Sequence, residues 1–132
     1  MKVLLDTNVV SVYINGRSST LRDKLKTVSP ADIHLCSVVW AELCVGIAKS
    51  SDPAKSRRKV SAFTELFISL PFDDAAAEAY GKIRAHLEKT GNLIGPNDLM
   101  IAAIAVSRNL TLITHNTDEF SRVPYLLRED WQ

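Results

Sequence analysis

The chain has 132 residues, of which 46% are hydrophobic, with 16 Lys and Arg against 15 Asp and Glu and a formal net charge of +1. This is the composition of one ordinary globular domain with a core of its own, and it excludes a disordered chain, a collagen-like repeat and a coiled coil. The near-zero charge gives no long-range attraction to nucleic acid or acidic partners, and no apolar run reaches the roughly 20 residues of a membrane span.

The N-terminal half alternates short apolar runs with helical patterns. Strands are expected at residues 2–5 and 33–36, and helices up to residue 14 and over residues 19–28, 38–49 and 54–70. Asp6-Thr7-Asn8, directly after the first strand, are residue types that begin helices, and Asn15-Gly16 end the first one. Ser37 is expected to cap the helix that follows the second strand.

The C-terminal half continues the same alternation. A short strand is possible at residues 70–72, helices are expected over 74–90 and 97–107, a strand over 110–114 and a loop over 115–120. Asp73-Asp74 begin the first of these helices and Pro96 suits the first position of the second. Strands alternating with helices predict a single α/β domain, residues 1–132, with a central, mainly parallel sheet.

Two further signals concern the cell compartment. Cys36 and Cys44 lie in apolar surroundings without metal-ligand or disulfide-framework spacing, which predicts reduced core cysteines. The run at residues 3–5 is cut off by Asp6, so no signal peptide is expected. We therefore expect a cytoplasmic protein that does not enter a membrane.

Carboxylates follow the predicted strands at their carboxyl ends, which is where open parallel sheets bind ligands. Asp6 ends the first strand, Glu42 lies early in the helix after the second, and Asp118 and Glu119 follow the last. Asp98 lies in the first turn of the helix that leads into that last strand. The topology therefore predicts that these acids gather at one edge of the sheet.

Each acid also has a purely structural interpretation. Asp6 could cap a helix, and Asp98 could stabilise a helix dipole by about 0.5 kcal/mol. Glu42 shares the apolar face of its helix, where a lone carboxylate is costly to desolvate unless a cation compensates it. Together, however, the acids predict a metal site, because converging carboxylates repel one another unless an ion such as Mg²⁺ or Mn²⁺ is bound.

A hard cation held by carboxylates suits phosphate-ester chemistry. Four residues are candidates to position the attacking water or the scissile phosphate, although each could serve only to satisfy turn backbone: Thr7, Asn8, Thr114 and Asn116. The histidines are not at metal-ligand spacing, and only His115 lies near the predicted site. If four of the 15 acidic residues belong to such a site, 15 − 4 = 11 remain against 16 basic ones, so the rest of the chain is moderately basic.

Four motifs in this order resemble the PIN-domain ribonucleases, and specifically the VapC toxins of bacterial toxin–antitoxin pairs. They are Leu4-Leu5-Asp6-Thr7-Asn8, the segment of residues 37–46 around Glu42, Gly95-Pro96-Asn97-Asp98-Leu99, and Thr114-His115-Asn116-Thr117-Asp118-Glu119-Phe120. The resemblance covers essentially the whole chain. It implies a PIN-like three-layer α/β/α fold, with catalytic acids at Asp6, Glu42, Asp98 and Glu119 and a metal role for Asp6 and Asp98.

The resemblance also implies an activity and a partner. It implies a toxin that is a Mg²⁺-dependent endoribonuclease, with Mn²⁺ as a substitute, that cuts structured RNA, commonly tRNA, and so inhibits translation. Similarity to the enterobacterial subgroup suggests the anticodon stem-loop of initiator tRNA. A VapB-type antitoxin and a toxin homodimer are expected, assembling into a larger complex. The fourth acid of the family directly precedes the Phe, which favours Glu119 over Asp118, although the family more often has Asp there.

Two other classes of function stay open at this point. One is a catalytically silent PIN-like module that binds RNA or protein. The other is a Mg²⁺-binding receiver-type signalling domain, which needs an adjacent acid pair after the first strand, where this chain has Asp6-Thr7-Asn8. A haloacid-dehalogenase-type phosphatase needs a second Asp in place of Asn8.

Overall fold

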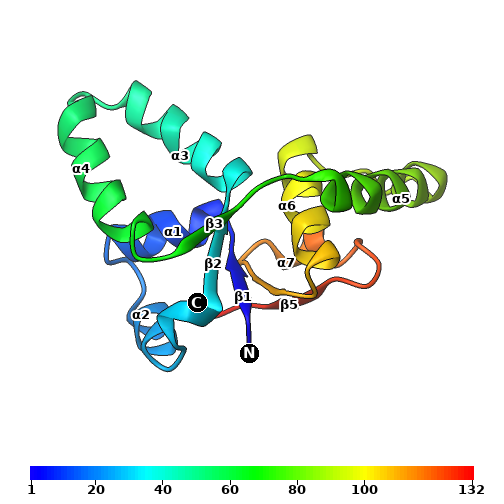
Figure 1. The fold of residues 1–132 in the computed structure, drawn as a ribbon, viewed down its shortest axis with the longest axis horizontal. Coiled ribbons are helices and arrows are strands. Elements are labelled where there is room, and N and C mark those ends of the chain that lie inside the picture. The colour runs from blue at the N-terminus through cyan, green and yellow to red at the C-terminus, as the bar shows by residue number, and fades with distance from the viewer.

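The computed structural model describes all residues, 1–132, and centres on a five-stranded sheet in which every pairing is parallel (Figure 1). The strands lie in the order β3-β2-β1-β4-β5 and are β1 (Val3–Leu5), β2 (Ile33–Cys36), β3 (Ile68–Leu70), β4 (Thr111–Ile113) and β5 (Leu127–Glu129). The helices are α1 (Thr7–Ile14), α2 (Ser19–Lys26), α3 (Ser37–Lys49), α4 (Pro53–Thr64), α5 (Asp74–Thr90), α6 (Pro96–Ser107) and α7 (Thr117–Phe120). None of them is long and apolar enough to cross a bilayer.

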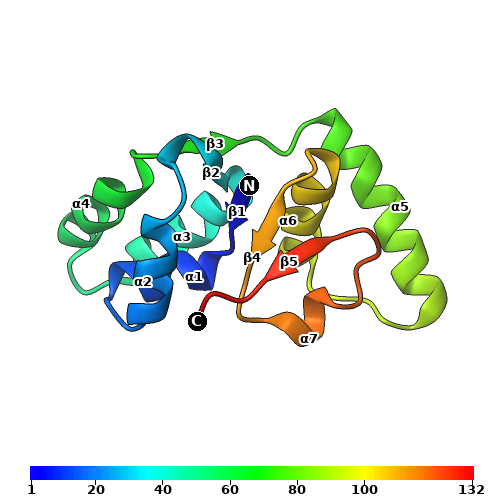
Figure 2. The ribbon, with the colours of Figure 1, turned by 90° about the horizontal axis from the view of Figure 1, so that it is seen from below.

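The strand order reverses at β1. The chain adds β2 and β3 on one side of β1 and then returns to add β4 and β5 on the other. With right-handed crossovers, this reversal places α1 to α4 on one face of the sheet and α5 and α6 on the other, as Figure 2 shows. The expected three-layer α/β/α architecture is confirmed. The connections diverge at the carboxyl ends of β1 and β4, which is the place at which open parallel sheets form a ligand-binding crevice.

The core is one continuous hydrophobic cluster that runs through the sheet. All three residues of β1 are fully buried, because the strand lies in the middle of the sheet with helices on both faces. Helix α6 is apolar on nearly every side and is buried over residues 101–105. The two elements that begin or end next to the crevice are therefore held rigidly.

The structure corrects three local predictions. Helix α4 ends at Thr64, and residues 68–70, expected to be helical, form the edge strand β3 because they pair with β2. Ser37 is not an N-cap: Cys36 has that position, and the Ser37 hydroxyl donates to the Leu70 carbonyl at 3.4 Å. The segment after β4 is not all loop, since residues 117–120 form one helical turn.

Strand β5 was not predicted from the sequence. Leu127 and Arg128 are exposed, so the strand has no apolar alternation, and its hydrogen bonds to β4 define it. The other elements agree with expectation to within a few residues. Residues 33–36, for instance, form β2 as predicted.

The end of α5 yields a stability prediction. Gly91 caps this helix with φ +70, a left-handed conformation that an L side chain adopts only with strain, although no atom stands within 4 Å of an added Cβ. Gly91→Ala should lower the free energy of unfolding by about 1 kcal/mol. Gly81→Ala, in the middle of the same helix and equally unobstructed, should raise it by about 0.5–1 kcal/mol. Urea unfolding of both variants measures the difference, and equal effects would contradict the prediction.

Candidate active site

Asp6 is the most buried of the four candidate acids, with 5% of its surface exposed. It is the N-cap of α1, where Oδ1 accepts the Thr7 backbone N–H at 2.8 Å. Its other oxygen, Oδ2, accepts the Thr114 hydroxyl at 2.8 Å, and its backbone N–H donates to the Ile113 carbonyl at 3.0 Å. The carboxylate is thus fastened to both β1 and β4 at the point where their connections diverge.

Glu42 reaches the same region from α3. Its Oε1 accepts the Thr7 hydroxyl at 2.7 Å, so the single residue Thr7 binds two different acids, Asp6 through its backbone N–H and Glu42 through its hydroxyl. Glu42 is half-buried and makes no ion pair. The contact with Thr7 orients the carboxylate without neutralising its charge.

Asp98 and Glu119 lie side by side, near the backbone of Gly95. Glu119 Oε1 accepts the Gly95 N–H at 3.0 Å and Oε2 accepts the Asn116 side-chain amide at 2.7 Å. A Cβ on Gly95 would stand 3.7 Å from Glu119 Oε1 and 4.0 Å from Asp98 Oδ2, so both carboxylates approach the same backbone position. Asp118 is exposed, so among the two neighbouring acids Glu119 is the one near Asp98.

The pKa values reflect the crowding of negative charge. Burial and then the charges of Glu119, Asp6 and Glu42 raise the pKa of Asp98 to about 7. Burial also raises the pKa of Asp6, against the hydrogen bonds from Thr114 and Thr7. Burial opposes ionisation of Glu119 as well, but the hydrogen bonds that it accepts leave the pKa of this carboxyl below its ordinary value.

The charge of Arg122 lowers the pKa of Glu119, but no ion pair offsets the charges of the four acids. The ion pairs are Arg84–Glu88, Arg108–Asp73 and His115–Asp130, and none involves the four acids. No set of three or more His, Cys, Asp or Glu side chains is arranged to hold a metal ion. An ion here would therefore take one or two carboxylates and complete its shell with water, which is the coordination that Mg²⁺ commonly has in proteins.

Of the remaining candidates, Thr114 and Asn116 contact the acids, whereas Asn8 and His115 do not. Thr114 is buried against Asp6, its hydroxyl accepts the Asn116 backbone N–H at 3.0 Å, and Asn116 binds Glu119. Asn8 is exposed in the first turn of α1 and contacts none of the acids by a hydrogen bond. His115 is engaged with Asp130, with 2.9 Å between Nδ1 and Oδ2.

Of the two residues that orient these acids, Thr7 was a candidate from the sequence and Gly95 was not. The Thr7 hydroxyl orients Glu42, and the Gly95 N–H orients Glu119. The role of Gly95 depends on a backbone group contacting a residue 24 positions away, and side-chain chemistry carries no signal of that.

The Thr114 contact leads to a second prediction. Thr114→Val keeps the shape of the side chain but removes the hydroxyl that binds both Asp6 and the Asn116 backbone. Losing one such supporting hydrogen bond should reduce RNA cleavage about ten-fold. Thr111→Val, at the start of the strand β4 that leads to Thr114, is the matched control and should retain full activity in an initial-rate assay. Equal activities of the two variants would contradict a supporting role for Thr114.

The chain is similar to known proteins along nearly its whole length. The PIN domain model matches residues 3–126. The chain is 37% identical over 131 residues to the tRNA(fMet)-specific endonuclease VapC of Shigella flexneri and 35% identical over 132 residues to Ribonuclease VapC2 of Rickettsia felis, covering 99% of this chain and 98% of each relative. It superposes on a chain in the crystal structure of VapBC2 from Rickettsia felis bound to a promoter DNA fragment, with a TM-score of 0.94, 34% identity and complete coverage of both chains.

Fold, full-length similarity and the order of the acidic motifs agree with one another. PIN-domain nucleases are generally dependent on divalent metal ions, in keeping with the uncompensated carboxylates described above. The chain belongs to the PIN-domain family and, within it, to the VapC ribonucleases.

Proposed function

We propose that the protein is the toxin of a type II toxin–antitoxin pair, a Mg²⁺-dependent endoribonuclease that hydrolyses phosphodiester bonds in structured RNA. The observation that carries the proposal is that four carboxylates, one capping α1 and the others on α3, α6 and α7, gather at the carboxyl ends of β1 and β4 and that none of them forms an ion pair. Such a donor set is unfavourable by itself and favourable around a divalent ion.

Within this proposal each residue has a role that its contacts support. Asp6 and Asp98 are the metal ligands, and Mn²⁺ can substitute for Mg²⁺. When bound, the ion supplies charge stabilisation to the phosphate and acidifies the attacking water. Glu42, oriented by Thr7, and Glu119, oriented by Gly95 and Asn116, complete the acidic wall that accepts hydrogen bonds from water. Thr114 keeps Asp6 in place, and Asn8 is exposed next to it for contact with the substrate.

The substrate and partners follow from the relatives. The Shigella flexneri relative is named for tRNA(fMet), so we propose initiator tRNA, cut in its anticodon stem-loop, as the target. The structural neighbours from Rickettsia felis and Haemophilus influenzae are VapBC assemblies, which supports a VapB-type antitoxin for this single-domain chain. We further propose that it forms a homodimer and acts in the cytoplasm, where translation takes place.

Sequencing RNA 5′ ends after induction of the protein tests this proposal. Parallel induction of the Asp6→Ala variant provides the background of ends that do not depend on the site. We expect new ends concentrated in the anticodon loop of initiator tRNA with the parent protein alone. Identical end profiles would instead support a catalytically silent RNA- or protein-binding module.

A further inference from the structure

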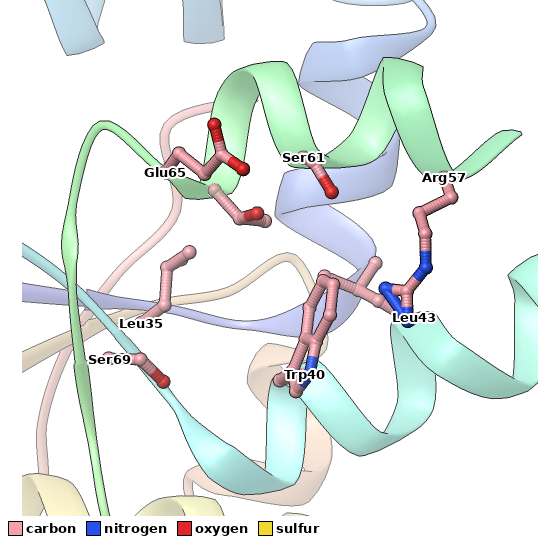
Figure 3. Close-up of a pocket in the computed structure, with 8 residues that line it drawn as sticks. Leu35, Trp40, Leu43, Arg57, Ser61, Glu65 and Ser69 are labelled. Atoms are coloured by element: carbon pink, nitrogen blue, oxygen red, sulfur yellow. The ribbon is translucent and has the colours of Figure 1, made fainter. Parts of the chain in front are cut away.

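A cavity of about 340 Å³ lies between α3, α4 and the strands β2 and β3, away from the four acids (Figure 3). Leu35 and Leu43 supply apolar lining, and Trp40 supplies an aromatic wall. Trp40 and Glu42 are two residues apart on α3, roughly 200° around the helix, so the cavity lies on the far side of α3 from the acids. A helix is about 10 Å thick, a distance that a few nucleotides of single-stranded RNA can span.

The aromatic wall is paired with a guanidinium group. Arg57 Cζ lies 5.7 Å from the centroid of the Trp40 ring, and Figure 3 shows the guanidinium reaching from α4 towards α3 beside the indole. Trp40 is half-buried and Arg57 is exposed, so the pair forms one end of the cavity and stays accessible from solvent. Aromatic rings and guanidinium planes are the surfaces on which proteins stack unpaired bases.

The rest of α4 presents a stripe of polar side chains to the cavity. Arg57, Ser61 and Glu65 recur at every fourth residue, with Thr64 beside them, so they share one face of the helix. The hydroxyls of Ser61 and Thr64 make no hydrogen bond within the chain. Elsewhere in the protein, helical Thr90 and Ser107 donate to backbone carbonyls of the preceding turn. The stripe therefore keeps free donors and acceptors directed at the cavity.

We propose that this cavity binds an unpaired guanine base of the RNA substrate, an inference that rests on the proposed nuclease function. The base stacks on Trp40, and the Glu65 carboxylate accepts hydrogen bonds from guanine N1–H and N2–H, the one nucleobase edge with two adjacent donors. Arg57 is placed for the phosphate of the same nucleotide. An apolar protein side chain is a poorer occupant, because it would cover the half-buried hydroxyls of Ser61 and Thr64 without giving them hydrogen-bond partners.

Trp40 fluorescence gives a direct binding measurement on the full chain. Trp131→Phe leaves Trp40 as the only tryptophan. With GMP we expect saturable quenching at a concentration about ten-fold lower than with AMP, CMP or UMP, and inorganic phosphate should give none. Quenching by all four nucleotides at the same concentration, or by phosphate, would overturn guanine recognition.

RNA binding, measured in EDTA so that no cleavage occurs, separates the base pocket from general charge. The probes are two labelled hairpins with the same stem, one with a guanosine in an adenosine loop and one with adenosines only. Glu65→Gln should weaken binding of the guanosine hairpin about ten-fold. It removes a negative charge, so a purely electrostatic effect would strengthen binding instead. Glu78→Gln, on α5, is the matched control for charge.

A second pair of variants tests the other end of the cavity. Arg57→Gln and Arg58→Gln each remove one positive charge from the same helix, but only Arg57 lines the cavity. Arg57→Gln should remove most of the preference for the guanosine hairpin, and Arg58→Gln should keep it. If GMP and the guanosine hairpin leave Trp40 emission unchanged, or if both variants behave alike, the inference is wrong. Because these measurements need no cleavage, that failure is distinguishable from failure of the proposed nuclease function.

Discussion

Asp98→Asn should lower the rate of RNA cleavage at least about a hundred-fold. Altering a residue that only supports a metal ligand typically costs 10–100-fold, so removing the charge of Asp98, a proposed direct ligand, should cost at least as much. Asp98 stands next to Glu119, and its pKa is raised by burial and by the charges of the other three acids, so it experiences the negative charge of the whole cluster. Single-turnover cleavage of labelled tRNA with Mg²⁺ measures the effect.

Asp118→Asn is the matched control for this experiment. Asp118 is exposed and adjacent to Glu119, so its substitution changes the net charge equally without altering the hydrogen bonds of the acidic crevice. The control should cleave at close to the parental rate. Comparable losses in the two variants would mean that overall charge, and not the position of Asp98, governs activity.

Asp98→Asn should stabilise the fold when no divalent ion is present. In EDTA, Asp98 is a half-buried carboxyl close to three other acids with no cation beside it, so neutralising it removes an unfavourable interaction. We expect a gain of about 1 kcal/mol in the free energy of unfolding, well below what the full pKa shift implies, because solvent screens a half-exposed group. For a chain of this length the melting temperature should rise by about 3–5 °C.

Added Mg²⁺ should raise the melting temperature of the parent protein more than that of the Asp98→Asn variant. The ion binds only the folded crevice of the parent, so it raises the melting temperature of the parent as its concentration increases. Asp98→Asn lacks one of the two proposed ligands and should show little of this rise. A thermal melt series in EDTA and in Mg²⁺ measures both effects. A variant that is less stable than the parent in EDTA would contradict the idea that the acids are held together against their repulsion.

Local signals in the sequence were sufficient for most of the framework. The apolar run ending at Asp6, the helix start at Pro96 and the cap pattern at Asp73 depend on residues within one or two turns of each other, and the structure agrees with all three. The short strands β3 and β5 were not predictable in this way. They lie at the edges of the sheet, where hydrogen bonding to a neighbouring strand, and not apolar alternation, defines the element.

The candidate site was likewise predictable in part from local sequence and in part only from the tertiary structure. The sequence by itself determined which acids are present, and the alternation of strands and helices was enough to predict that they meet at the carboxyl edge of a parallel sheet. Only the tertiary structure decided how each is held: Asp6 by Thr114 across β1 and β4, Glu42 by Thr7, and Glu119 by Gly95. These contacts join residues 24 to 108 positions apart, and their geometry depends on the packing of whole elements, which no local pattern encodes.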